Sequence, residues 1–339
     1  MSEDHSADEP STDELSNERG SPTTNDSARH ETTVGRRSYL RLAGATAASA
    51  SLISSLGTAA AEAYDTLTIP AGVHATPSDY SELLVTSGEI RENLLVDVTA
   101  DGASAIMVAR GSDWVIRDIG FKGVCDGDPD YSSAKCIRAD VDSGSNGTIS
   151  TCYFGDGGTS NGYVGIFVKD SHAGDLKIRQ CDVSNFANNG IYASAPGQSD
   201  GGGGEVNIDS CYAKNNNVAQ YRLGTDTSDL KDSIAHVDSD VGSLDGVENA
   251  RGLWVRNEAN VEVTNSDVLL EHPDASYCFW EDDDSGGVIR IHDSELDYRD
   301  GADGYFKPGG DYDTNNNGQT PDVTKQSYIP VSAEDAADD

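Results

Sequence analysis

Short apolar alternations separated by Asn-, Gly- and Asp-rich turns recur along the chain from residue 105 onward. One phrase reads apolar-x-apolar, as in "GIFVKD" (165–170), and a second reads apolar-x-x-small-x-apolar, as in "KIRQCDV". Strands and turns that repeat every 25 to 32 residues or so, without helical periodicity, predict a solenoid rather than a sandwich. The anchors of the first phrase are Ile106, Ile137, Ile166, Ile191, Tyr221, Leu253, Cys278 and Tyr305.

Three cysteines return at the same phase of the second phrase. Cys152, Cys181 and Cys211 follow one another at nearly equal intervals. In a parallel solenoid, equivalent positions stack at about 4.8 Å, so we expect these cysteines to form an inward ladder that Ser266 and Ser294 continue. A disulfide framework is the alternative and fits these three poorly. Two further cysteines, Cys125 and Cys136, flank the loop "DGDPDYSS", and a bridge between them stays open. A zinc site is not indicated, because no paired CxxC occurs.

The repeats, the early phrase "LTIPAG" (67–72) and the rung-like "GSDWVIRDIGFKG" (111–123) resemble the right-handed parallel β-helix superfamily of pectate lyases and related polysaccharide enzymes. This resemblance implies an all-β, single-stranded right-handed parallel β-helix of about eight rungs over residues 64–307. It also implies an exported protein that acts on a polysaccharide. The same superfamily contains noncatalytic spikes and adhesins, so the fold alone does not assign an activity.

The N-terminal residues indicate export. Residues 1–35 are polar and acidic without apolar periodicity and are expected to be disordered. In residues 36–63, Arg36 and Arg37 precede a short apolar run that ends at Ala61-Glu62-Ala63, which resembles a twin-arginine signal peptide. A membrane anchor is the alternative, but the run is short for a span of roughly 20 residues. We therefore expect an extracellular or cell-surface protein that is not inserted in the membrane after cleavage.

The balance of acidic and basic residues limits the classes of molecule that the protein is expected to bind. The chain carries 59 acidic and 23 basic residues, for a net charge of −36. A field of this sign repels nucleic acid and anionic lipid, so neither is an expected partner. Such evenly spread acidity resembles the proteins of salt-loving archaea, with cation binding as the alternative interpretation. The partner that the resemblance implies is an extracellular polysaccharide, and the oligomeric state is not indicated.

Alternation along the strands of the first phrase predicts an outward face. If Ile166 and Val168 point inward, Phe167 and Lys169 point outward. Flat rings pack on the apolar faces of sugars, so a column of them predicts a groove for an extended polymer; the alternative is that a loop, the tail or a neighbouring subunit covers the rings. The first outward column is Met107, Arg138, Phe167, Tyr192, Gln220, Trp254, Phe279 and Phe306, of which Phe167, Tyr192, Gln220, Trp254 and Phe279 are the expected substrate contacts.

A second outward column carries cations beside carboxylates: Asp140, Lys169, Arg222, Arg256 and Glu281. With the resemblance, it favours a polysaccharide lyase acting on uronic-acid polymers by β-elimination. Arg222 and Arg256 would neutralise the uronate carboxylate, Lys169 would take the C5 proton, and Asp140 and Glu281 would contact substrate. A ladder of surface salt bridges is the alternative.

Other chemistries are less well supported by the sequence. Hydrolysis would need two carboxylates at a set separation, and neither the glycosidase nor the pectate-lyase catalytic motifs are recognisable. A noncatalytic β-helix for glycan binding, adhesion or surface structure is therefore the second hypothesis. The mature histidines show no ligand spacing.

One motif suggests a metal. "DYDTNNNGQTPD" (311–322), within the acidic C-terminal tail of residues 308–339, begins like a calcium loop with Asp313, Asn315 and Asn317. It lacks the glutamate expected at the twelfth position and has no helical flanks. Calcium is the cofactor that this pattern indicates, and a plain Asn/Gly turn is the alternative.

Overall fold

The computed structural model describes residues 64–127, 130, 133–158, 162–282 and 286–338. The chain divides into two units, Met1–Thr58 and Ala59–Asp339, and every described residue belongs to the second. The segments predicted to be disordered (1–35) and to be an export signal (36–63) lie outside the described residues. No helix within the described ranges is long and apolar enough to cross a membrane.

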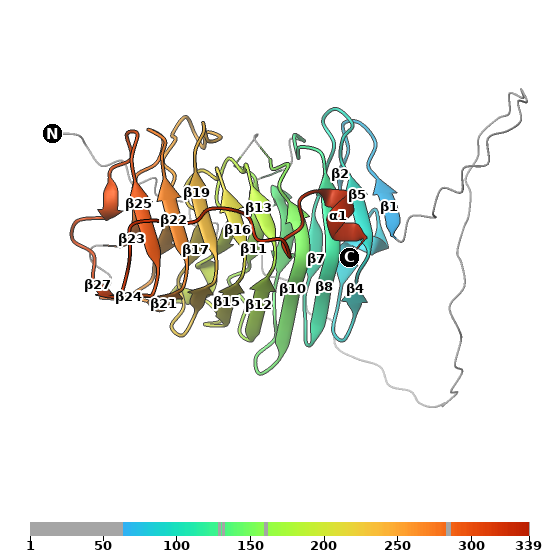
Figure 1. Ribbon diagram of the computed structural model, residues 1–339. Coiled ribbons are helices and arrows are strands. Elements are labelled where there is room, and N and C mark those ends of the chain that lie inside the picture. The colour runs from blue at the N-terminus through green and yellow to red at the C-terminus, as the bar shows by residue number, and fades with distance from the viewer. Residues whose placement is uncertain (1–63, 128–129, 131–132, 159–161, 283–285, 339) are drawn as a thin grey trace, which may run out of the picture. The chain divides into compact units, whose positions relative to one another are not determined.

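The second unit is a parallel β-solenoid of about eight turns with almost no helix (Figure 1). Each turn, here called a rung, passes through three faces in a fixed order, as in β12 (Asp175–Arg179), β13 (Asp182–Ser184) and β14 (Ile191–Ala193). The next strand, β15 (Glu205–Asp209), then pairs in parallel with β12. This arrangement confirms the predicted all-β parallel β-helix.

Three faces therefore run along the solenoid, and β8 and β10 bend through two of them. Face 1 contains β4 (Ile90–Arg91), β8 (Trp114–Lys122), β10 (Asn146–Phe154), β12, β15, β18 (Asp229–Lys231), β21 (Asn260–Thr264), β24 (Val288–His292) and β27 (Tyr312–Asn315). Face 2 contains β1 (Asp65–Thr68), β5 (Leu94–Asp97), the ends of β8 and β10, β13, β16 (Tyr212–Lys214), β19 (Ile234–Val237), β22 (Asp267–Leu270) and β25 (Glu295–Tyr298).

Face 3 is a separate nine-stranded sheet: β3 (Leu84–Val85), β7 (Met107–Ala109), β9 (Lys135–Ala139), β11 (Val164–Val168), β14, β17 (Tyr221–Leu223), β20 (Leu253–Val255), β23 (Tyr277–Glu281) and β26 (Gly304–Phe306). A short pair, β2 (His74–Ala75) with β6 (Ser104–Ala105), and two single-turn 3-10 helices at Ser81–Leu83 and Ala195–Gly197 complete the early and middle rungs.

Aliphatic side chains fill the interior because strand register places like residues above one another. The pairing of β8, β10, β12, β15, β18, β21 and β24 aligns one such residue from each strand. All are buried, and each contributes on the order of 1.5–3 kcal/mol by leaving water. The stack is Ile116, Ile149, Ile178, Ile208, Leu230, Val263 and Ile291.

The predicted cysteine ladder lies at the corner between faces 1 and 2. The pairings Tyr153–Asp182 and Asp182–Tyr212 put the preceding residues, Cys152, Cys181 and Cys211, in one stack, and all three are fully buried. The ladder continues through Ser233, which the sequence phrases did not reveal, and through the predicted Ser266 and Ser294. Each of these hydroxyls accepts a backbone N–H from the rung before, at 3.1–3.2 Å.

The C-terminal residues do not end as a free tail. β27 adds a strand to the last rung, and the segment that follows, residues 320–338 (the C-terminal strap), returns along face 2 toward the first rungs (Figure 1). It ends in α1 (Ala333–Ala337), whose N-cap Ser332 accepts the Asp335 N–H at 3.1 Å. Gly120 makes this close approach feasible, since a Cβ there would lie 1.9 Å from the Ala333 carbonyl oxygen.

Candidate functional site

The outward side of face 3 carries cations and aromatic rings in direct register. Strand pairing aligns one outward residue from each of six consecutive strands, β9 to β23. The Lys307 N–H donates to the Phe279 carbonyl, and the Lys307 ammonium lies 4.3 Å from the Trp280 ring centre, so Lys307 extends the row. We call this row the outward ladder: Arg138, Phe167, Tyr192, Arg222, Trp254, Trp280 and Lys307.

Arg222 is held between two rings at the middle of the outward ladder. Its guanidinium carbon lies 4.1 Å from the Tyr192 ring centre and 4.3 Å from that of Trp254. Both Tyr192 and Arg222 are buried, at 4% exposure each. A guanidinium stacked on ring faces keeps its charge while its in-plane N–H donors point past the rings.

Two more arginines surround Trp254. The guanidinium of Arg251 lies 4.5 Å from the Trp254 ring centre and 4.0 Å from that of Trp280, and the guanidinium of Arg256 lies 5.0 Å from Trp254. Asp282 fixes the edge of this group, because it accepts from Trp254 Nε1 at 2.9 Å and from Arg256 Nε at 2.8 Å. Three cations thus meet at one half-buried ring in a strongly acidic chain.

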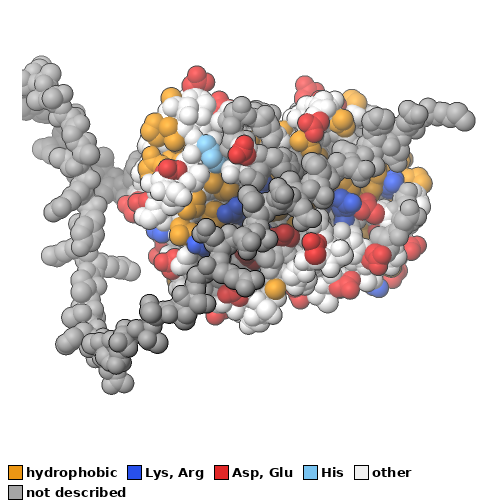
Figure 2. Space-filling view, turned by 180° about the vertical axis from the view of Figure 1, so that it is seen from behind, with side chains coloured by type: hydrophobic (Ala, Val, Ile, Leu, Met, Phe, Trp, Pro, Cys, Tyr) orange, Lys and Arg blue, Asp and Glu red, His pale blue; other side chains and the backbone are white. Residues whose placement is uncertain are grey.

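The earlier rungs repeat this arrangement with fewer groups. The rings of Phe167 and Tyr192 meet edge to face at 5.1 Å, and the Lys135 ammonium lies 4.9 Å from the Phe167 ring centre. In Figure 2, which shows the side opposite to Figure 1, lysine and arginine side chains lie among hydrophobic ones. The described part of face 3 therefore places positive charge beside ring surface at several rungs.

The predicted phase was wrong at three rungs, those of Met107, Phe279 and Phe306. Met107 pairs with Ile137 and is fully buried, so it points inward, and Val108 takes the outward position. Phe279 pairs with Leu253, is fully buried and stacks on Phe306 at 6.0 Å. Phe306 pairs with Phe279 and packs against the core, so it points inward as well. In these three strands apolar residues occupy both faces, so alternation alone did not fix which face was buried.

Gln220 and Glu281 also lie elsewhere than predicted. Gln220 is fully buried, accepts the Asn216 N–H at 3.1 Å and donates to the Asn216 carbonyl at 2.8 Å, so it braces a turn. Glu281 pairs with Val255, is 2% exposed and accepts the Asp311 N–H at 3.3 Å. Neither belongs to an outward column; Trp280 and Asp282 occupy the positions predicted for Phe279 and Glu281.

The structure does not gather the three residues predicted to be catalytic. Arg222 belongs to the outward ladder, where Arg256 reaches the same Trp254 ring. Lys169 lies two strands away from Arg222 along face 3, at about 10 Å by the spacing of paired strands. Its ammonium contacts Ser171 Oγ at 2.9 Å, and that hydroxyl donates to Asp140 at 2.7 Å. The described neighbours of its ammonium are thus a hydroxyl and a carboxylate, Ser171 and Asp170.

The residues predicted to bind calcium lie on and after an edge strand. Asp313 and Asn315 are exposed alternate residues of β27, where the motif would require a loop. The Asn317 side-chain oxygen accepts the Ser294 N–H at 3.0 Å, and its amide donates to the Ile291 carbonyl at 3.0 Å, so Asn317 caps the corner ladder. The strand geometry gives calcium no support here, and the cofactor assignment stays a prediction.

Three features escaped the sequence reasoning. Arg251 stands directly before the phrase "GLWVRN" (252–257), three residues before the predicted Trp254, and Lys307 ends the phrase "GYFK" (304–307), but neither was assigned to a column. His272 meets Asp240 of the preceding rung, with Nε2 at 3.2 Å, and Asp274 two residues later in the chain, with Nδ1 at 3.4 Å. The contact with Asp240 forms across rungs, so no linear spacing marks the whole group.

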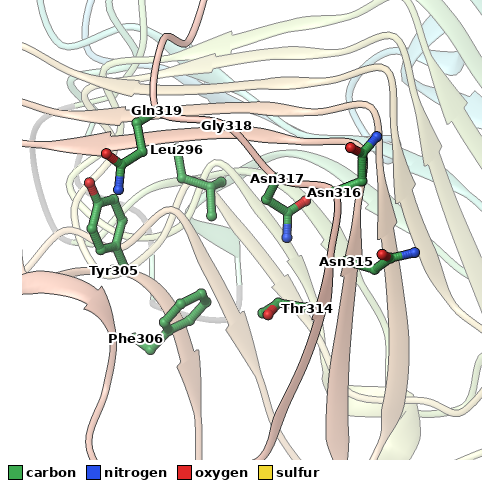
Figure 3. A pocket seen from close by; sticks show the side chains of 9 residues that line it. All are labelled: Leu296, Tyr305, Phe306, Thr314, Asn315, Asn316, Asn317, Gly318 and Gln319. Carbon is green, nitrogen blue, oxygen red and sulfur yellow. The ribbon is translucent and has the colours of Figure 1, made fainter.

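A cavity of about 340 Å³ opens at the last rung (Figure 3). Its lining mixes the Tyr305 and Phe306 rings with Thr314 and the Asn315–Asn317 segment, and Figure 3 shows the Gln319 amide beside the Tyr305 hydroxyl. This space lies at the end of the solenoid interior and holds no cluster of charged groups. The outward ladder is the stronger candidate site.

No known protein family, curated protein or solved structure matches this chain. What the chain does must therefore be argued from the outward ladder and its surroundings.

Proposed function

We propose that the protein binds an extended anionic polysaccharide along the outward ladder. The observation that carries this proposal is the register of cations and rings on one face of a chain whose net charge is −36. Along this face, several cations lie over aromatic rings, so that positive charge and flat apolar surface are presented together. The ligand class that matches both features is a polymer of sugars bearing carboxylates or sulfates.

The geometry suits a polymer better than a small metabolite. Seven positions one rung apart extend over roughly 29 Å at the spacing of parallel strands. The accessible part is centred on Trp254 and Trp280, which are half-buried, with Arg256 beside them. Sugar rings would stack on the indoles, and their anionic groups would meet the guanidinium N–H donors.

A lyase is the second candidate, and the three guanidiniums around Trp254 favour it. Their charge would stabilise the enolate formed when the C5 proton of a uronate leaves. The candidate lacks an assigned base, since Lys169 lies at another level of the solenoid. Incubation with uronic-acid polymers, followed by ultraviolet absorbance of the unsaturated product, separates a lyase from a protein that only binds.

Two variants test the binding proposal. Trp254→Ala should weaken binding to a uronic-acid polymer about tenfold, equivalent to about 1.4 kcal/mol, because a stacking surface is lost. Arg256→Ala should weaken binding to that polymer by a similar factor and leave binding to neutral dextran unchanged. Affinity electrophoresis at low and at molar NaCl measures the affinity of each variant for each polymer.

Arg117→Ala is the matched control, because Arg117 is an exposed arginine of face 1 that pairs with Glu92. It should leave polymer binding unchanged. The alternative, that Trp254 is a ring covered for structural reasons, predicts a clear fall in melting temperature on Trp254→Ala with unaltered affinity. That result would end the proposal.

Export through the twin-arginine route is proposed on the sequence alone, from Arg36, Arg37 and the apolar run that follows. An acidic surface that keeps the chain soluble in concentrated salt is consistent with work outside the cell. Replacing both arginines with lysine should retain the precursor inside cells, as seen by immunoblotting of cell and medium fractions. Undiminished secretion of the double variant would contradict this proposal.

A further inference from the structure

Two buried cysteines lie side by side early in the solenoid. Cys125 follows β8, where its N–H donates to the Gly157 carbonyl at 2.9 Å, and Cys136 is the second residue of β9. Both are 1% exposed. Their sulfur atoms lie 3.7 Å apart, in direct contact.

The other four cysteines also contact backbone carbonyls. The thiols of Cys152 and Cys181 point to backbone carbonyls two residues earlier, at 3.1 and 3.2 Å. Cys211 and Cys278 each face a carbonyl at about 3.6 Å. The thiols of Cys152, Cys181 and Cys211 also interact with one another along the corner ladder, where neighbouring rungs are about 4.8 Å apart. The sulfur contact of 3.7 Å joins Cys125 and Cys136.

We propose that Cys125 and Cys136 form a structural disulfide when the chain folds in the presence of a small disulfide oxidant. One thiolate attacks the oxidant and releases one small thiol. The second thiolate then attacks the mixed disulfide and releases another. The two cysteines lose two protons and two electrons, and the oxidant is reduced to two thiols. Closing the sulfur contact to a bond of about 2.05 Å requires roughly 1.7 Å of movement, within reach of side-chain rotation.

The timing of the reaction follows from burial. Desolvation raises the pKa of Cys136, so its thiolate is scarce in the folded protein and exchange there is slow. We therefore expect the bond to form during folding. Once formed, it ties the end of β8 to the start of β9 across a short loop, where it restricts the unfolded chain.

The test is oxidative refolding followed by peptide mapping. The denatured full chain is refolded in a glutathione redox buffer or in excess dithiothreitol, and free thiols are then alkylated. Trypsin cuts after Lys122, Lys135 and Arg138, so the two cysteines fall in separate peptides, 123–135 and 136–138. Oxidised protein should yield these peptides joined, with the other four cysteines alkylated. Its melting temperature should exceed that of the reduced protein by about 5–10 °C.

Controls separate this bond from adventitious oxidation. Cys125→Ser and Cys136→Ser should each abolish the joined peptide, whereas Cys152→Ser, at a position where later rungs carry serine, should retain it. Six alkylated thiols in protein that has refolded oxidatively, as judged by its circular dichroism, would overturn the proposal. A bridge within Cys152, Cys181 and Cys211 would overturn it as well. Because the wild-type chain gives the deciding result, the test does not depend on the variants folding.

Discussion

At the scale of single residues, a left-handed backbone residue makes each corner between faces 1 and 2. Thr151, Gln180 and Ser210 have φ of 51, 54 and 57°, and the residue that follows each one enters the corner ladder. Ile119 occupies this interior corner position in β8, and the smaller cysteine and serine side chains occupy it in the rungs that follow. In the later rungs, the serine hydroxyl also donates to the carbonyl two residues earlier, as Ser233 does at 2.7 Å.

This geometry predicts that Cys211→Ser is tolerated. The new hydroxyl could accept the Cys181 N–H and donate to the Asp209 carbonyl, repeating the pattern of Ser233, so we expect the free energy of unfolding to change by less than about 1 kcal/mol. Ile208→Ser, in the aliphatic stack of the same rung, should cost about 3 kcal/mol or more because it leaves a cavity and a hydroxyl without such partners. Urea denaturation measures both. Equal losses in the two variants would contradict this account of the corner.

Single residues also show how far the sequence alone could go. The anchors Ile137, Ile166 and Ile191 were correctly predicted to point inward, since strand pairing stacks them and all three are fully buried. The phrases around Met107 and Phe279 place apolar residues on both faces, so their phase depended on strand pairing. In "AQYRL" (219–223), Tyr221 was correctly predicted to point inward. Arg222 takes the position in the outward ladder that was predicted for Gln220, which is buried. The rings of the site were largely predictable, whereas their contacts with Arg251 and Lys307 were not.

At the scale of elements, the C-terminal strap holds several rungs together. Lys325 meets the buried carboxylate of Asp182, donates to the Pro330 carbonyl at 3.3 Å and lies 5.1 Å from the Tyr212 ring centre. Ile329 packs against Tyr212 and Ile234. No repeat phrase could have predicted this, because Lys325 and Asp182 are 143 residues apart and the strap itself is polar and aperiodic.

Lys325→Met should release the strap. Burial raises the pKa of Asp182, and Lys325 opposes that shift, so removing the ammonium leaves a buried carboxylate without its cation. We expect a loss of about 3–5 kcal/mol in the free energy of unfolding at neutral pH, with faster proteolysis of residues 320–338. Because the pKa of Asp182 rises further, the variant should regain stability as pH falls. Adding Asp182→Asn to Lys325→Met should restore much of the lost free energy of unfolding. A double variant that is no more stable than Lys325→Met alone would show that the ion pair does not hold the strap.

At the scale of the whole molecule, the excess of carboxylates has an energetic consequence on face 1. Asp229 pairs with Asn207 and Glu262 on neighbouring strands and is half-buried. Burial, and then the charges of Glu205, Asp209 and Glu262, raise its pKa from 3.8 to about 6. The folded state therefore holds a proton that the unfolded chain has already released, and stability falls as pH rises from about 4 to about 6.

Asp229→Asn should remove that part of the pH dependence and stabilise the protein at neutral pH. The folded carboxylate is ionised at pH 7 and repelled by its neighbours, so its loss should add about 1 kcal/mol to the free energy of unfolding, after allowance for solvent screening at a half-buried site. Part of this gain comes from relief of charge repulsion and should shrink in 1 M NaCl, where the Debye length is about 3 Å. The part that comes from relief of desolvation should persist. Urea denaturation of both proteins at pH 4 to 8, at low and at molar salt, measures these two contributions to the free energy of unfolding. Parallel pH profiles for variant and wild type would mean that Asp229 titrates at its ordinary pKa, and that the acidity of this face is tolerated without the strain argued here.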